Sequence, residues 1–255
     1  MRLIALALVV ATAAGRGYPP GELTIAAAAN LTDVFQQIGP RFQAATGIRP
    51  VFSFGSTAQL TQQIEHSAPY DLFAAADSEH VDQLDRERLL LAGTRSVYAT
   101  GILALWVPPQ SKASISRIED LTSPAVRVIA VAKPELAPYG QATVDTLRHL
   151  GIWDKVKSKI VYADSISMAK QYGASGNADA VFTAYSLVLK ESGRTLRVDD
   201  GLHQSIRQSL GVMAASANQP QARRFVAFLL TGEGRQILAS HGYQVPPISR
   251  QGEMK

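Results

Sequence analysis

Short apolar runs that favour β-strands alternate with segments of helical periodicity along most of this chain. After residue 31, apolar side chains recur at the helical spacing of 31, 34, 35, 38 and 42. Strands are expected at 22–30, 49–54 and 70–77, and helices at 31–47, 56–67 and 79–90. This βαβαβα order predicts an α/β fold with a mainly parallel sheet and helices on its faces. Pro40 is a possible kink in the first helix, and Gly47 is its expected end.

The rhythm changes near Tyr98, where a long apolar run over 96–109 contains Gly101. Strand, small-residue turn and helix then repeat over 125–151 and 158–176, and a strand is expected at 207–216 before a closing helix pair at 219–243. We therefore predict two α/β lobes: residues 17–98 and 205–255 form lobe 1, and residues 99–204 form lobe 2. The crossovers near 98–101 and 201–207 are the expected hinges.

The first residues have the pattern of a secretory signal peptide, predicted to span 1–16. Arg2 precedes a short apolar core, Leu3 to Val10, and the small residues 11–13 suit a cleavage site. The sequence contains no cysteine, which excludes disulfides, thiol catalysis and a lipid-modified N-terminal cysteine. These features predict an exported, unanchored protein of the periplasm.

Four predicted strand-to-helix junctions share small, neutral residues. They are Ala29-Asn30-Leu31, Ser56-Thr57-Ala58, Pro138-Tyr139-Gly140 and Ser165-Ile166-Ser167. The first turn of a helix has N–H groups without partners and a positive dipole end, so it attracts anions. A single such turn is usually only a helix cap. Several that meet in one cleft would form a strong anion site.

Other functional classes have weaker support. The net charge is +4, but Lys and Arg form no run, which argues against nucleic acid as a partner. The five histidines have no metal-ligand spacing, and both the P-loop and the GxSxG motif are missing. Asp71 and Asp77 could form an acid/base pair, although Asp71 at a strand start and Asp77 as a helix cap is the simpler interpretation. We therefore predict that the protein is not an enzyme.

Four segments together resemble the periplasmic molybdate-binding proteins of ABC importers. They are AAAANL, FGSTAQLTQQIEHSAPYDLFAAAD, KPELAPYGQAT and SGNADAVF, and the similarity extends from about residue 23 to 246. The resemblance implies a two-lobed type II periplasmic binding protein fold that closes over a tetrahedral oxyanion. It also implies a monomer that delivers its ligand to an inner-membrane ABC permease with its ATPase, and no cofactor other than the ligand itself.

The family's ligand groups correspond to six positions of this sequence. Ala29 and Asn30 match the first turn, and Ser56 and Thr57 match the second. Tyr139 and Ile166 match the turns of the other lobe, where the resemblance implies main-chain N–H donors. Asn30, Thr57, Tyr139 and Ile166 are thereby expected to bind the molybdenum as molybdate.

This sequence departs from many family members at two places. Asn30 stands where many have serine, and Thr183 stands where some have a ligand-binding tyrosine, with Tyr185 two residues later. A site made only of donors suits molybdate, tungstate and sulfate, which are full dianions, whereas phosphate carries a proton that needs an acceptor. Molybdate, with tungstate, is the expected ligand. Another tetrahedral oxyanion such as sulfate, or a secreted hydrolase, is the alternative.

Overall fold

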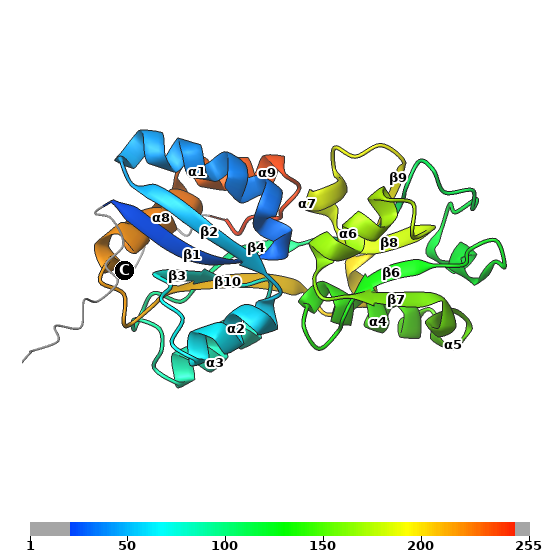
Figure 1. The fold of residues 1–255 in the computed structure, drawn as a ribbon, viewed down its shortest axis with the longest axis horizontal. Helices are drawn as coiled ribbons and strands as arrows, with labels where there is room; N and C mark the ends of the chain where they lie inside the picture. Colours follow the sequence, from blue (N-terminus) through cyan, green and yellow to red (C-terminus); the bar gives the residue numbers. More distant parts are fainter. Residues whose placement is uncertain (1–20, 248–255) are drawn as a thin grey trace, which may run out of the picture.

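A computed structural model describes residues 21–247, so the predicted signal peptide lies outside the described residues. The chain forms two lobes side by side, each built on a five-stranded sheet (Figure 1). Within residues 21–247, no helix combines the length and apolar character needed to cross a membrane.

Lobe 1 contains a sheet in the order β2-β1-β3-β10-β4. Its strands are β1 (Glu22–Ala28), β2 (Arg49–Gly55), β3 (Leu72–Ala74), β4 (Ser96–Gly101) and β10 (Ile206–Val212). The β1–β2 and β1–β3 pairs are parallel, whereas β10 is antiparallel to both β3 and β4. The parallel pairs follow from helical crossovers, and the antiparallel pairs are made by strands at the passage between the lobes.

Helices cover both faces of this sheet. One face packs against α1, α8 and α9, and the other against α2 and α3 (Figure 1). Their bounds are α1 (Thr32–Thr46), α2 (Thr57–Glu65), α3 (Glu79–Arg86), α8 (Gln219–Thr231) and α9 (Glu233–Ser240). The rings of Phe42 and Phe225 meet edge to face with centroids 5.0 Å apart, which ties the C-terminal helices to α1.

The boundaries of α1 agree with the sequence signals. Pro40 lies inside the helix without dividing it, and Gly47 follows its last residue with a left-handed φ of 74°. Glycine adopts that conformation without strain, so it ends the helix.

The expected strand at 70–77 is shorter than predicted, because only Leu72–Ala74 pairs within the sheet.

Lobe 2 contains a second sheet, ordered β7-β6-β8-β5-β9. Its strands are β5 (Leu103–Val107), β6 (Ile129–Ala132), β7 (Ile160–Ala163), β8 (Ala180–Ala184) and β9 (Arg194–Arg197). Helices α4 (Pro138–His149) and α5 (Trp153–Val156) cover one face, and α6 (Ile166–Ala174) and α7 (Tyr185–Val188) the other (Figure 1). Short 3-10 helices are η1 (Ala29–Leu31), η2 (Ile118–Thr122), η3 (Lys157–Lys159) and η4 (Asp200–Leu202).

The chain passes between the lobes twice, once directly after the expected hinge at 98–101 and once in a segment that overlaps the expected hinge at 201–207. One passage joins β4 to β5 at Ile102, and the other leads from β9 through η4 to β10. The predicted boundary after residue 98 falls inside β4, which continues to Gly101.

Each sheet has two parallel and two antiparallel strand pairs, so the sheets are mixed rather than mainly parallel.

Candidate functional site

The carboxyl ends of parallel strands from both lobes point toward the cleft between them. In lobe 1, β1 leads into η1 and β2 leads into α2. In lobe 2, β6 leads to α4 and β7 leads to α6. Helix N-termini follow the carboxyl ends of the strands in such sheets, which is where α/β folds bind their ligands. The four junctions singled out in the sequence therefore meet at one place.

A small cavity lies at this meeting point. It is lined by residues of both lobes: Ala28, Ala29, Asn30, Gly55, Ser56, Thr57, Ala76, Ala137, Pro138, Tyr139 and Ile166. The cavity is very small, with a volume of only about 10 Å³. This is about the space that one water molecule needs. The structure thus brings together all six residues expected from the sequence.

Five lining residues are not among the six expected ligand residues, although Pro138 belongs to one of the four junctions and the position of Ala76 could have been inferred. Ala76 follows the third parallel strand of lobe 1, so the geometry of the sheet edge alone would have placed it at the site. The others, Ala28, Gly55, Ala137 and Pro138, are small or apolar neighbours of predicted residues. Because they offer no side-chain donor, chemistry in the sequence did not reveal them.

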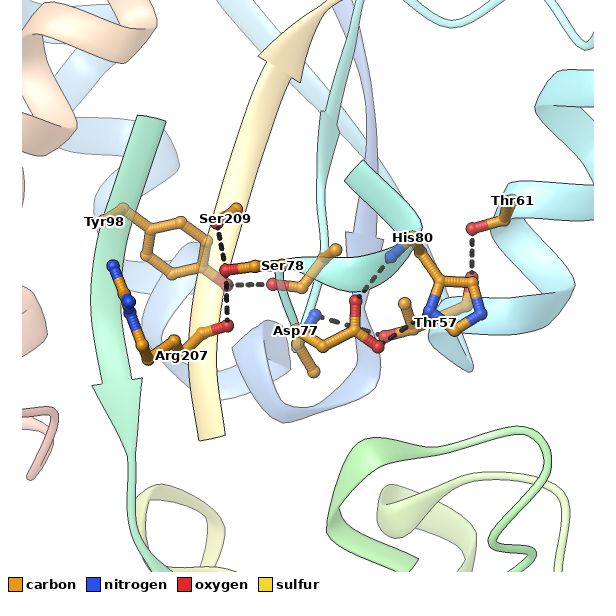
Figure 2. A network of polar contacts seen from close by, with 10 residues as sticks. Thr57, Thr61, Asp77, Ser78, His80, Tyr98, Arg207 and Ser209 are labelled. Carbon is orange, nitrogen blue, oxygen red and sulfur yellow. Dashed lines mark hydrogen bonds and ion pairs between the residues drawn. The ribbon is translucent and has the colours of Figure 1, made fainter. Parts of the chain in front are cut away.

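Thr57 presents a hydroxyl donor to the cavity. Its Oγ1 accepts a hydrogen bond of 3.1 Å from the N–H of Ala76 (Figure 2). The hydroxyl hydrogen of Thr57 is therefore left for another acceptor. Thr61 donates to the Thr57 carbonyl at 2.9 Å and anchors the same turn. Thr57 is 1% exposed, so a ligand bound here would be largely shielded from water.

Two side-chain atoms of the site are buried without a partner. They are Ser56 Oγ and Asn30 Oδ1, on residues that are 3% and 1% exposed. A buried polar atom without a hydrogen bond costs about 1–3 kcal/mol, and such atoms are uncommon in folded proteins. Unpaired polar atoms on two junctions of one cavity indicate that a polar ligand belongs there.

The main-chain N–H groups of three helix starts add further donors. Thr57 is the first residue of α2, Ile166 is the first of α6, and Tyr139 is the second of α4. Groups at these positions have no acceptor within their own helices. Their dipoles also add positive potential in the cavity. The site is thus a set of neutral donors contributed by both lobes.

The phenol of Tyr139 is engaged inside the protein, which leaves the main-chain N–H as the contact expected there. The side chain is 2% exposed, and its hydroxyl accepts a 2.8 Å hydrogen bond from Gln208 Nε2. Thr183 and Tyr185, considered as replacements for a family tyrosine, do not line the cavity. Thr183 instead donates to the carbonyl of Ile166 at 3.3 Å, and the Tyr185 ring lies against Arg197. Thr183 therefore positions the start of α6 rather than a ligand.

Hydrogen bonds hold the lobes closed around the cavity. The N–H of Ala58 donates to the Leu136 carbonyl at 3.2 Å, and Ser167 Oγ donates to the Ala29 carbonyl at 2.9 Å. Between the lobes, Lys170 Nζ of lobe 2 also lies 3.9 Å from the Asp33 carboxylate of lobe 1. These contacts close the lobes directly over the four junctions.

Charged side chains line a separate groove outside the cavity. That groove includes Asp77 and His80, whose side chains lie 2.7 Å apart (Figure 2). Burial is the largest single effect and lowers the pKa of His80, but the hydrogen bond to Asp77 and the negative charges of Asp77, Glu79 and Glu65 together outweigh it and leave the pKa raised. Asp77 also accepts from the His80 N–H, and Asp71 accepts from the Thr24 N–H at 2.7 Å. Both carboxylates thus have the structural partners that the simpler interpretation of the sequence gave them.

Comparison with known proteins agrees with this architecture. The family of bacterial extracellular solute-binding proteins matches residues 23–244 of the chain. The protein belongs to this family. This solute-binding protein is 33% identical over 227 residues to the molybdate-binding protein ModA of Rhodobacter capsulatus, with 88% of each chain covered. It is 34% identical over 247 residues to ModA of Azotobacter vinelandii, covering 92% of this chain and 96% of the relative.

A solved structure confirms the fold predicted for this solute-binding protein. The periplasmic molybdate-binding protein of Azotobacter vinelandii superimposes with a TM-score of 0.84 and 30% identity, covering 88% of this chain and 99% of the other. The two-lobed type II fold expected from the sequence motifs is therefore correct. The family is described as one of solute-binding proteins and not as a family of enzymes.

Proposed function

We propose that this protein is the solute-binding component of an ABC importer and that it binds molybdate, and also tungstate, between its lobes. The observation that carries the proposal is the convergence of helix starts from both lobes on one cavity without a charged side chain among its lining residues. Neutral donors suit a fully deprotonated oxyanion. Relatives that are 33% and 34% identical carry the name of molybdate-binding proteins, which supports the same ligand.

The size of the cavity supports a small, compact ion. With room for about one water molecule, the closed lobes would admit a tetrahedral ion after a slight separation. A solute as large as a sugar or an amino acid would hold them apart. The permease, its ATPase and the periplasmic location follow from the same proposal, since a solute-binding protein of an importer delivers its ligand at the membrane.

Calorimetry of the mature protein with molybdate, tungstate, sulfate and phosphate tests the proposal. We expect molybdate and tungstate to bind and phosphate to bind far more weakly, because its proton would need an acceptor. Tighter binding of sulfate than of molybdate would assign the site to another oxyanion. Absence of binding by all four ions would refute an oxyanion site.

Replacement of Thr57 by alanine is expected to lower molybdate affinity by at least about tenfold. A hydrogen bond to a charged group contributes about 1.5–3 kcal/mol, and the Thr57 hydroxyl hydrogen is free for the ligand. Thr57→Ser, which keeps the hydroxyl, is the matched control and should stay close to wild type. Equal calorimetric affinities for the alanine and serine variants would exclude this contact.

Molybdate affinity is expected to change by less than about threefold between about pH 6 and about pH 9. Tyr139 is the one titratable side chain that lines the cavity, and burial raises its pKa well above the ordinary value. It therefore stays neutral over this range. Calorimetric titrations at several pH values, each in two buffers, check the prediction and count protons exchanged on binding. A strong pH dependence would show that an ionised group takes part.

A further inference from the structure

A buried chain of neutral side chains lies behind the cavity and spans the two lobes. Its centre is Gln208 on β10, which is 0% exposed. Gln208 Oε1 accepts from Asn30 Nδ2 at 2.9 Å and lies 2.8 Å from the Tyr98 hydroxyl. Gln208 Nε2 donates to the Tyr139 hydroxyl at 2.8 Å. Gln208 thus joins a residue of the cavity in lobe 1 to a helix start in lobe 2.

In this arrangement Asn30 is poorly suited to an anion. Its Nδ2 is directed to Gln208 and to the Tyr243 hydroxyl, 3.1 Å away, which leaves Oδ1 as the unpaired buried atom. An amide oxygen that faces an oxyanion repels it. The Tyr98 hydroxyl has a single hydrogen, yet both Gln208 Oε1 and the Ala75 carbonyl lie 2.8 Å from it.

A half-turn of both amides gives every one of these groups a partner except Asn30 Nδ2. Tyr139 then donates to Gln208 Oε1, while Gln208 Nε2 donates to Asn30 Oδ1 and to the Tyr98 hydroxyl. Tyr98 keeps its hydrogen for the Ala75 carbonyl. Asn30 Nδ2 is released toward the cavity as a donor. The half-turn only exchanges the oxygen and the nitrogen of each amide, so the set of heavy-atom positions stays the same.

Tyr243 also contacts the Asn30 amide and has to adjust to this half-turn. Its hydroxyl donates to the Asn30 carbonyl at 2.7 Å and accepts from Ser186 Oγ at 3.1 Å. After the half-turn Asn30 Oδ1 lies 3.1 Å from this hydroxyl, so the single phenol hydrogen is shared between Oδ1 and the Asn30 carbonyl.

We propose that Gln208 is a positioning residue that holds Asn30 with its NH2 group toward a fully deprotonated oxyanion. This inference rests on the proposed function. It also gives Gln208 a role in specificity. Because Gln208 Nε2 donates a hydrogen bond to Asn30 Oδ1, this oxygen cannot accept the proton of a ligand such as hydrogen phosphate. Without Gln208, Asn30 is free to present either end of its amide to the cavity.

Gly101 supplies an independent observation. A Cβ atom at this position would lie 2.0 Å from the Tyr139 hydroxyl oxygen and 2.4 Å from Gln208 Nε2. Such distances are impossible for non-bonded atoms, so any other residue would displace the bond between Gln208 and Tyr139. Glycine at the end of β4, where the chain passes between the lobes, keeps this space open.

Gln208→Met tests the proposal, because methionine has a similar volume but forms no comparable hydrogen bonds. We expect calorimetry on the mature protein to show a loss of molybdate affinity of at least about tenfold and a lower ratio of molybdate to phosphate affinity. In an Asn30→Ala background the same change should cost less than about twofold, since Gln208 acts through Asn30. Gln141→Met, on the exposed side of α4, is the control and should bind as wild type.

The outcomes separate this inference from the proposed function. If wild type binds no oxyanion, the proposed function is wrong. If wild type binds molybdate but Gln208→Met binds equally well, or loses the same factor with and without Asn30, the role of Gln208 is refuted and the function stands.

A second measurement does not depend on the stability of the variant. In 15N-labelled wild-type protein, the side-chain NH2 signals of Asn30 and Gln208, assigned by their loss in the two variants, should both shift on addition of molybdate. If both signals stay unchanged while main-chain signals of the cavity move, the half-turn does not occur.

Discussion

Ser56→Asp is expected to lower molybdate affinity by at least about a thousandfold, or about 4 kcal/mol. Ser56 Oγ is buried and unpaired at the cavity. A carboxylate there would face a dianion, and two unit charges about 4 Å apart repel by about 4 kcal/mol at an effective dielectric constant of about 20. Calorimetry or competition with labelled molybdate measures the loss.

Ser56→Asn separates charge from size in this experiment. Asparagine has nearly the volume of aspartate, and both residues cap helices well, so α2 should begin in the same way in both variants. We expect the asparagine variant to keep measurable affinity. If the two variants bind molybdate within about tenfold of each other, the negative charge is not near the ligand and position 56 is not part of the site.

Gly140→Ala is expected to destabilise the protein by about 2–3 kcal/mol and to weaken molybdate binding. A Cβ atom at Gly140 would lie 2.2 Å from the main-chain oxygen of Ala132 at the end of β6. Main-chain atoms yield less easily than a flexible side chain, so α4 would have to move away from the sheet. That movement would carry the N–H of Tyr139 out of the cavity.

Thermal unfolding without ligand measures the first effect, and calorimetry measures the second. A loss of this size corresponds to a fall in Tm of roughly 5–10 °C for a chain of this length. Gly201→Ala is the control, because its Cβ atom would approach only the side chain of Asp199, at 3.3 Å. Equal Tm values for the two alanine variants would refute the packing argument.

The sequence was most informative where local chemistry decides the structure. The alternation of strands and helices predicted both lobes, and small neutral residues at four junctions predicted which turns meet. Gly140 belongs to a motif recognised in the sequence, but the reason for the glycine became visible only in its contact with β6. Thr183 was aligned with a ligand residue, whereas it binds the carbonyl of Ile166.

The network behind the cavity could not be predicted, because its members are far apart in the sequence. Asn30, Tyr98, Tyr139, Gln208 and Tyr243 come from five separate elements or loops. Asn30 and Tyr139 belong to junctions recognised in the sequence, but nothing local indicates that Gln208 reaches them, and a glutamine in a strand is usually expected to face solvent. Only the antiparallel return of β10 between β3 and β4 brings Gln208 to the centre of the molecule.

The division of the donors between the lobes has a consequence for transport. Thr57 belongs to one half of the molecule, whereas Tyr139 and Ile166 belong to the other. Neither half alone surrounds an ion, and none of the residues that line the cavity carries a positive charge to retain it after the halves separate. A membrane protein that separates the two halves would therefore release the cargo simply by moving their donors apart. It would not have to neutralise a charge or move a proton.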